Sequence, residues 1–170
     1  MKKYLFVLIS FSLMAGVYCQ EKLDIEKEKQ AVISVNEEER DAYFDRDLSR
    51  LEAIWIQEPN SRRVFASSSG PRVLDGWNQI YSNYETDINN AEMWESSEDV
   101  FASFSNYDIK IYKNTALIYH DIHWTGKVNG EPIDWNQKRI VHCVKDDGVW
   151  KLDLIVQMSV PEKDEVEELP

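Results

Sequence analysis

An α+β fold is predicted for this chain, because its first half shows helical periodicity and its second half shows strand alternation. Residues 24–47, 48–57 and 76–89 carry apolar side chains at helical spacing. From residue 100 onward, apolar and polar side chains tend to alternate with a period of two. We therefore expect three N-terminal helices packed on one face of a strongly curved, mostly antiparallel sheet.

The first half also contains residues that mark where these helices begin and end. Glu58-Pro59-Asn60 ends the second helix, because proline cannot continue one. Residues 62–67 read as a short strand, and Ser68 to Pro71 read as a turn. Asp75 is positioned to cap the third helix.

The second half is expected to form strands at 100–104, 109–112, 116–125, 135–145 and 149–160. Lys113-Asn114 and Asp146-Asp147-Gly148 are turn sequences between neighbouring strands. Alternation in the last strand predicts that one set of side chains faces the core. These are Trp150, Leu152, Leu154, Val156 and Met158.

Composition narrows the class of protein. The chain has 170 residues and a net charge of −12, which disfavours nucleic acid as a partner. Its 43% hydrophobic content is enough for a folded core. With only Cys19 and Cys143, no disulfide framework is expected.

Residues 1–19 resemble a secretory signal, with a basic start at Lys2 and Lys3 followed by an apolar run. Cleavage after Cys19 and lipid modification of Cys19 are the two outcomes, and the residues before Cys19 favour cleavage. We expect a periplasmic or secreted protein, anchored to a membrane only if Cys19 is lipidated. The folded domain is expected at 24–161, followed by an acidic tail at 162–170.

Several motifs, in this order, resemble the nuclear transport factor 2-like superfamily and its SnoaL-like branch. The best single matches are the Asp147-Gly148-Val149-Trp150 turn and the terminal Ser159-Val160-Pro161. Three earlier motifs also match: Arg40-Asp41-Ala42-Tyr43, Leu74-Asp75-Gly76-Trp77 and Ile111-Tyr112-Lys113-Asn114-Thr115-Ala116.

The resemblance implies a cone with an internal pocket, and a homodimer formed through the sheet. It does not imply one activity, because this scaffold carries isomerases, cyclases, dehydratases and binding modules. Many relatives have a histidine near the end of the last strand. Here Val156-Gln157-Met158-Ser159 holds no ionisable group, so acid–base chemistry from that strand is not expected.

The leading hypothesis is an exported domain that binds a small, largely apolar molecule inside the cone. Trp55 and Trp124 would supply flat apolar walls, and His120 and His142 would supply polar groups. Arg139 would lie at the rim.

Two alternatives stay open. One is a proton-transfer enzyme such as an isomerase, cyclase or dehydratase, with His120 as the weak candidate for the base. The other is a dimerisation or interaction module using Tyr119, His123 and Trp135 on the outer face of the sheet.

No metal site and no cofactor are expected. His120 and His123 lie three residues apart on one strand, so their side chains point to opposite faces and cannot converge on one ion. Cys143 has no basic partner at a fixed spacing and is expected to serve packing.

Overall fold

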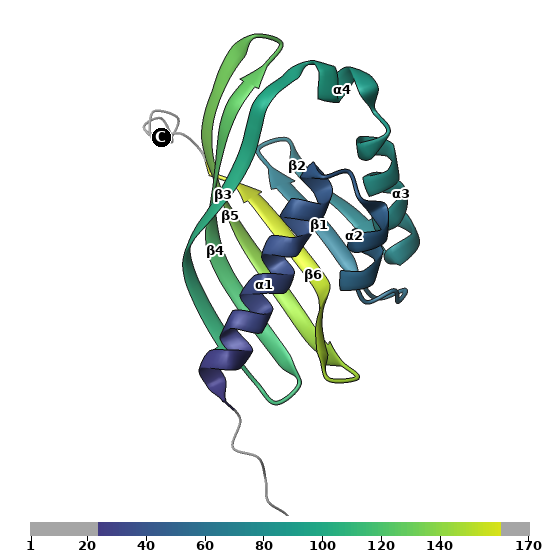
Figure 1. Ribbon diagram of the computed structural model, residues 1–170, viewed down its shortest axis with the longest axis vertical. Helices are drawn as coiled ribbons and strands as arrows, with labels where there is room; N and C mark the ends of the chain where they lie inside the picture. Colours follow the sequence, from purple (N-terminus) through teal and green to yellow (C-terminus); the bar gives the residue numbers. More distant parts are fainter. Residues whose placement is uncertain (1–23, 161–170) are drawn as a thin grey trace, which may run out of the picture.

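Six strands form one sheet in a computed structural model that describes residues 24–160 (Figure 1). The strand order is β2-β1-β6-β5-β4-β3, and every neighbouring pair is antiparallel except β1 and β6. The strands are β1 Arg62–Ser67, β2 Gly70–Asp75, β3 Ser97–Ile111, β4 Thr115–Val128, β5 Glu131–Asp146 and β6 Val149–Ser159. The predicted signal at 1–19, Cys19 and the tail at 162–170 lie outside the described residues.

All the helices lie on one face of this sheet (Figure 1). They are α1 Ile25–Phe44, α2 Leu48–Ile54, α3 Trp77–Ile88 and α4 Ala91–Glu95. The side chains of Asp24 and Asp47 accept a backbone N–H in the first turn of α1 and α2, which fixes where each helix begins. No helix among residues 24–160 has the length and apolar content that crossing a membrane requires.

The link between α2 and α3 differs from the prediction. Residues 70–75 pair with β1 as a sixth strand, although Gly70 and Pro71 resemble a turn in the sequence. Because Asp75 is the last residue of β2 and forms an ion pair with Arg62, it does not cap α3. Gly76 holds the N-cap position with a φ of 85°, a backbone conformation that favours glycine.

Two predicted strands, 100–104 and 109–112, are parts of a single strand, β3. The pairing of β3 with β4 shifts between Glu98 and Phe101 and between Ser105 and Asp108. Asp99 and Asn106 have positive φ at these shifts, so the strand continues through two bulges that resemble a loop in the sequence. The chain also forms α4, which the sequence analysis does not expect.

The predicted alternation in β6 is wrong beyond Asp153. Cys143 pairs with Leu152, but the preceding His142 pairs with Leu154, so the register shifts at this point. The shift moves every later side chain to the opposite face. As a result Ile155 and Gln157 are buried, whereas Leu154, Val156 and Met158 are only partly buried.

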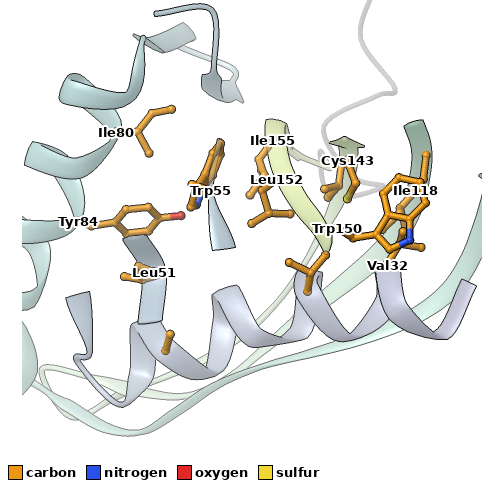
Figure 2. Close-up of a cluster of buried hydrophobic side chains, with 14 of the residues drawn as sticks. Val32, Leu51, Trp55, Ile80, Tyr84, Ile118, Cys143, Trp150, Leu152 and Ile155 are labelled. Carbon is orange, nitrogen blue, oxygen red and sulfur yellow. The ribbon is translucent and has the colours of Figure 1, made fainter. Parts of the chain in front are cut away.

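The hydrophobic core lies between the helices α1, α2 and α3 and the inner face of the sheet (Figure 2). One inner-face row runs across Ala116, Cys143, Leu152 and Trp55, which the strand register places side by side. All four are fully buried. Val32 and Val35 of α1 belong to the same core, so the space between this row and α1 is filled by apolar packing.

Candidate functional site

A polar cluster occupies the inner face of the sheet toward the C-terminal half of α1. The strand register places His120, Arg139 and Gln157 opposite one another across β4, β5 and β6. Asn36 and Glu39 of α1 reach this row from the helix layer. These five buried side chains stand where an apolar core would otherwise continue.

A cavity of about 30 Å³ lies within this cluster. It exceeds the roughly 10–15 Å³ that one water molecule needs, but it is far smaller than pockets for drug-sized ligands, at about 300–1,000 Å³. Residues from α1, β1, β3, β4, β5 and β6 surround it. They are Glu39, Arg40, Tyr43, Arg63, Ala102, Phe104, Trp124, Arg139 and Gln157.

Glu39 is the buried anion of the cluster, with only 2% of its surface exposed. Its carboxylate lies 2.8 Å from Nη1 of Arg139 and 3.4 Å from Nη2 of Arg63, and the Tyr84 hydroxyl donates to it at 2.6 Å. Burial alone would raise the pKa of Glu39, but the two guanidinium groups and the hydroxyl lower it to about 2. Glu39 is therefore ionised at neutral pH.

The two arginines are not fully satisfied. Arg139 donates to Glu39 and, at 3.0 Å, to Gln157, yet its Nε has no acceptor among the described residues. Arg63 packs over the Tyr84 ring at 4.4 Å, and its buried Nε and Nη1 likewise find no acceptor within 24–160. Buried donors without partners are costly, so these three N–H-bearing atoms are an unusual feature.

His120 is held as a neutral, hydrogen-bonded ring. Its Nδ1 lies 3.1 Å from the Asp121 carbonyl, so Nδ1 carries the proton, and Nε2 accepts from the Asn36 amide at 3.1 Å. Burial and then the nearby charge of Arg139 lower the pKa of His120 to about 4. Phe104 and Tyr107 pack against the ring at 4.6 and 5.1 Å, and His120 is not among the cavity-lining residues.

Aromatic side chains extend from the cavity to the surface. Trp124 lines the cavity, stacks on Trp135 at 5.7 Å and contacts Phe44 at 6.2 Å. The prediction that Trp135 lies on the outer face is wrong, because it pairs with Trp124 across β4 and β5 and therefore shares its face. Phe44 stacks in turn on Phe101 at 5.8 Å. Phe101 and Trp135 are 46% and 39% exposed, whereas Phe44 and Trp124 are partly buried. We name these four residues the aromatic shelf, which reaches solvent through Phe101 and Trp135.

A chain of hydrogen bonds joins the aromatic shelf to the charged cluster. The Trp124 indole donates to Oε1 of Gln137 at 2.9 Å, and the Gln157 amide donates to the same oxygen. Gln157 accepts from Arg139, which donates to Glu39. These bonds fix the orientation of the side chains between the shelf and the cavity.

The structure brings together only part of the predicted pocket. Trp124 and Arg139 line the cavity, and His120 lies next to Arg139 in the neighbouring strand. Trp55 belongs to the apolar core, where its indole nitrogen is buried without a partner among residues 24–160. His142 is on the outer face of the sheet, where its Nδ1 lies 3.0 Å from an Asp153 oxygen, so it cannot share a pocket with Arg139.

Asn36, Glu39 and Arg63 are not among the site residues predicted from the sequence. A signal for two of them exists, because Asn36 and Glu39 follow Val32 and Val35 at helical spacing and so fall on the buried stripe of α1. A charged residue on such a stripe is rarely buried unless it has a partner. Arg63 carries no comparable signal in its short strand.

Other candidate groups are accounted for by local structure. Across the described range, no three His, Cys, Asp or Glu residues are grouped so that they could hold a metal ion. Cys143 is buried in the apolar row, and burial raises the pKa of its thiol to about 12. A thiol with that pKa is protonated at neutral pH and is a poor nucleophile.

Comparison with known proteins identifies the fold. A nuclear transport factor 2-like superfamily protein from Salmonella enterica serovar Typhimurium LT2 superposes with a TM-score of 0.63 at 16% identity, covering 85% of this chain and 99% of that one. The hexachlorocyclohexane dehydrochlorinase LinA-type3 from Novosphingobium barchaimii LL02 gives 0.62 at 18% identity, covering 87% and 98%.

A nuclear transport factor 2-like protein from Cytophaga hutchinsonii gives a TM-score of 0.58 at 16% identity, covering 78% of this chain and 98% of that one. No protein-family model matches the sequence, and no curated protein matches it significantly. The chain therefore has the nuclear transport factor 2-like fold, as its sequence motifs predict. At these identities the comparison concerns the fold alone.

Proposed function

We propose that this nuclear transport factor 2-like domain binds a small molecule at the aromatic shelf, with one polar group of that molecule entering the cavity. The observation that carries the proposal is the continuity from exposed Phe101 and Trp135, through Trp124, to the charged cluster. Stacked aromatic surface suits a ring-bearing ligand. The body of the ligand lies on the shelf because the cavity holds only a small group.

This proposal modifies the expectation of a largely apolar pocket. The shelf supplies the apolar contact, whereas the bottom of the site contains Glu39, Arg63 and Arg139. Buried polar groups in a binding site fix the orientation of a ligand and select its chemistry. The expected ligand is therefore amphipathic, with an apolar ring and a compact polar end.

Native mass spectrometry of the full chain, purified from an exporting host, tests the proposal. We expect a retained small molecule that is lost in Trp124→Ala and kept in Tyr112→Ala. Tyr112 is a matched control, since it is an aromatic residue outside the aromatic shelf and is 57% exposed. Equal retention by both variants would contradict the assignment of the shelf.

An acid–base enzyme has less support from this geometry. The LinA-type3 dehydrochlorinase shares the fold, so the scaffold is compatible with catalysis. His120, however, uses Nε2 to accept from Asn36 and packs behind Phe104, away from the cavity. A general base must reach the proton it removes. Chemical conversion of the retained molecule by the wild-type protein, abolished in His120→Gln, would restore the catalytic alternative.

A second function, self-association, is favoured by the outer face of the sheet. An apolar row crosses five strands through Val73, Val64, Val156, Ile140 and Tyr119, and the helices all lie on the opposite face (Figure 1). Val73 and Tyr119 are 48% and 39% exposed. An exposed apolar strip of this extent is typical of an interface, and we propose a homodimer formed through it.

Light scattering after size exclusion tests the dimer. Tyr119→Glu places a charge in the row and is expected to give a monomer, whereas Tyr112→Glu leaves the dimer intact. A wild-type monomer at high protein concentration would refute self-association through this face.

Export remains a proposal based on the first 19 residues. Intact mass measurement of the processed protein is expected to give a chain that begins at Gln20. A lipid-modified Cys19 would support the membrane-anchored alternative.

A further inference from the structure

We infer that the cavity is a carboxylate-binding site, in which a carboxylate accepts hydrogen bonds from Arg63 and Arg139. The inference rests on the proposed function and specifies its ligand class: a ring-bearing acid whose carboxylate enters the cavity while its ring lies on the aromatic shelf. The observations that carry it are the buried donors without partners, the charge of the cluster and the size of the cavity.

The donors are the first observation. Nε of Arg63, Nη1 of Arg63 and Nε of Arg139 are buried, and nothing in the described chain accepts from them. Both arginines line the same cavity. Arg63 and Arg139 are only 7% and 3% exposed, so bulk water does not replace the missing acceptors. These three atoms are enclosed by protein, so an acceptor in the cavity would satisfy them only after the two guanidinium groups turn toward it.

Charge is the second observation. The groups that face the cavity at close range are two guanidinium cations and one carboxylate, Glu39. His120 is neutral, because burial lowers its pKa to about 4. Arg40 also lines the cavity, and its charge is matched by Asp41 at 2.7 Å. The residues that line the cavity, counted together with Asp41, therefore carry one excess positive charge.

Asp87 is the remaining acidic group near Arg63. It lies in α3, is partly exposed and accepts a hydrogen bond from Asn83 at 2.8 Å. Within residues 24–160 it makes no ion pair with either arginine. Asp87 therefore screens Arg63 without supplying the acceptor that its Nε and Nη1 lack.

Size selects a carboxylate over larger anions. Guanidinium N–H groups donate charge-assisted hydrogen bonds to carboxylate and phosphate oxygens alike, so the small volume of the cavity makes the choice. The cavity of about 30 Å³ admits a compact head group of this kind. Phe104 and Trp124 line the same space and would contact the carbon to which the carboxylate is attached.

Two sources could supply this chemistry: a free small acid, or a carboxylate of the chain's own acidic residues at 162–170, which follow β6 three residues beyond Ser159. Both predict the same contacts with Arg63 and Arg139. Comparing the full chain with a chain that ends at Val160 separates them.

The test is a titration of the full chain with formate, benzoate and benzamide at constant ionic strength, followed through the Nε–H NMR signals of the arginines. We expect formate and benzoate to shift the signals of Arg63 and Arg139, and benzamide to bind at least tenfold more weakly than benzoate. Arg63→Met is expected to weaken carboxylate binding at least tenfold. Arg62→Met, in the neighbouring exposed position, is the control and leaves binding unchanged.

Formate and benzoate binding to the Trp124→Ala and Arg63→Met variants distinguishes the carboxylate site from the aromatic shelf. If Trp124→Ala weakens benzoate but not formate, both the shelf and the carboxylate site are supported. If formate binding requires Arg63 but Trp124→Ala changes neither acid, the carboxylate site stands and the shelf proposal fails. If benzoate and benzamide bind equally and Arg63→Met has no effect, the carboxylate inference is overturned, even where Trp124 is required.

The truncated chain identifies the source. If it binds formate as the full chain does, a free acid is the ligand. If truncation strengthens formate binding at least tenfold, the residues beyond Val160 occupy the site as its carboxylate source. Failure of both chains to bind formate, with unchanged Arg63 and Arg139 signals, overturns the inference.

Discussion

Two rows on the inner face of one sheet have opposite character. The row Ala116, Cys143, Leu152 and Trp55 is apolar and closed, whereas the row His120, Arg139 and Gln157 is polar and borders a cavity. The same helix covers both, through Val32 and Val35 at one end and Asn36 and Glu39 at the other. Apolar burial stabilises the first row, but the second places charges where desolvation is costly.

This difference separates residues that serve folding from residues that serve a site. Replacing buried ionic groups with apolar side chains is often neutral or stabilising in proteins. A cluster that includes two arginines with unpaired donors is therefore poorly explained by stability alone. Substitutions in the apolar row should consequently change stability, whereas substitutions around the cavity should also change ligand binding.

The largest effect is expected for Glu39→Gln. Loss of the carboxylate leaves Arg63 and Arg139 as uncompensated buried cations, so the free energy of unfolding should fall by about 3–5 kcal/mol. Glu38→Gln is the control, since Glu38 pairs with Arg50 in a partly exposed position and its loss should cost far less. Equal losses in urea titrations of the two variants would remove the distinction between buried and surface charge.

Leu152→Ala should come next, with a loss of about 2–5 kcal/mol, because it opens a cavity in the apolar row. Leu154→Ala is expected to cost less, since Leu154 lies on the other face beyond the register shift at Asp153. The free energies of unfolding of both variants, measured by chemical denaturation, show which side chains of β6 are buried. A larger loss for Leu154→Ala would support the uninterrupted alternation expected from the sequence.

A smaller effect concerns pH. The pKa of His120 is lowered from 6.5 to about 4 by burial and by Arg139, so the unfolded chain takes up a proton here between these values and the folded chain does not. Stability should therefore fall as pH drops from about 6.5 to 4, by up to about 1.4 kcal/mol per pH unit from this group.

His120→Gln should flatten the stability profile in that window. The contribution of Glu39 begins lower, since its pKa is lowered from 4.5 to about 2 and its stabilisation is lost only as pH falls through that range. Thermal unfolding at a series of pH values checks both statements. An unchanged slope in His120→Gln would mean that His120 is not buried in its neutral form.

Much of the fold could be predicted, because long elements carry strong periodicity. α1, β4 and β5 occur close to their expected ranges, and the motif order correctly indicates the fold. The errors fall where tertiary pairing overrides a local pattern. Gly70 and Pro71 are turn residues that pair with β1 at the start of β2, and the register shift at Asp153 reverses the faces of β6.

The site was harder to predict than the fold. Trp124 and Arg139 could be proposed as pocket residues because they lie on strands that show apolar–polar alternation. The register between strands, which the sequence does not show, decides which residues of neighbouring strands lie opposite each other. His142 shows this, since one position along β5 separates it from the inner face. Glu39 is polar on an apolar helix stripe, and only its partners on distant strands explain its burial.

The central claim is that the charged groups around the cavity, Arg63 among them, are retained for binding and not for stability. The most direct measurement is the free energy of unfolding of Arg63→Met, compared with wild type in buffer free of carboxylates. Glu39 keeps Arg139 and Tyr84 in this variant. The account therefore predicts stability within about 1 kcal/mol of wild type, or higher. A loss as large as that of Leu152→Ala would contradict it, because Arg63 would then be a structural residue like those of the apolar row.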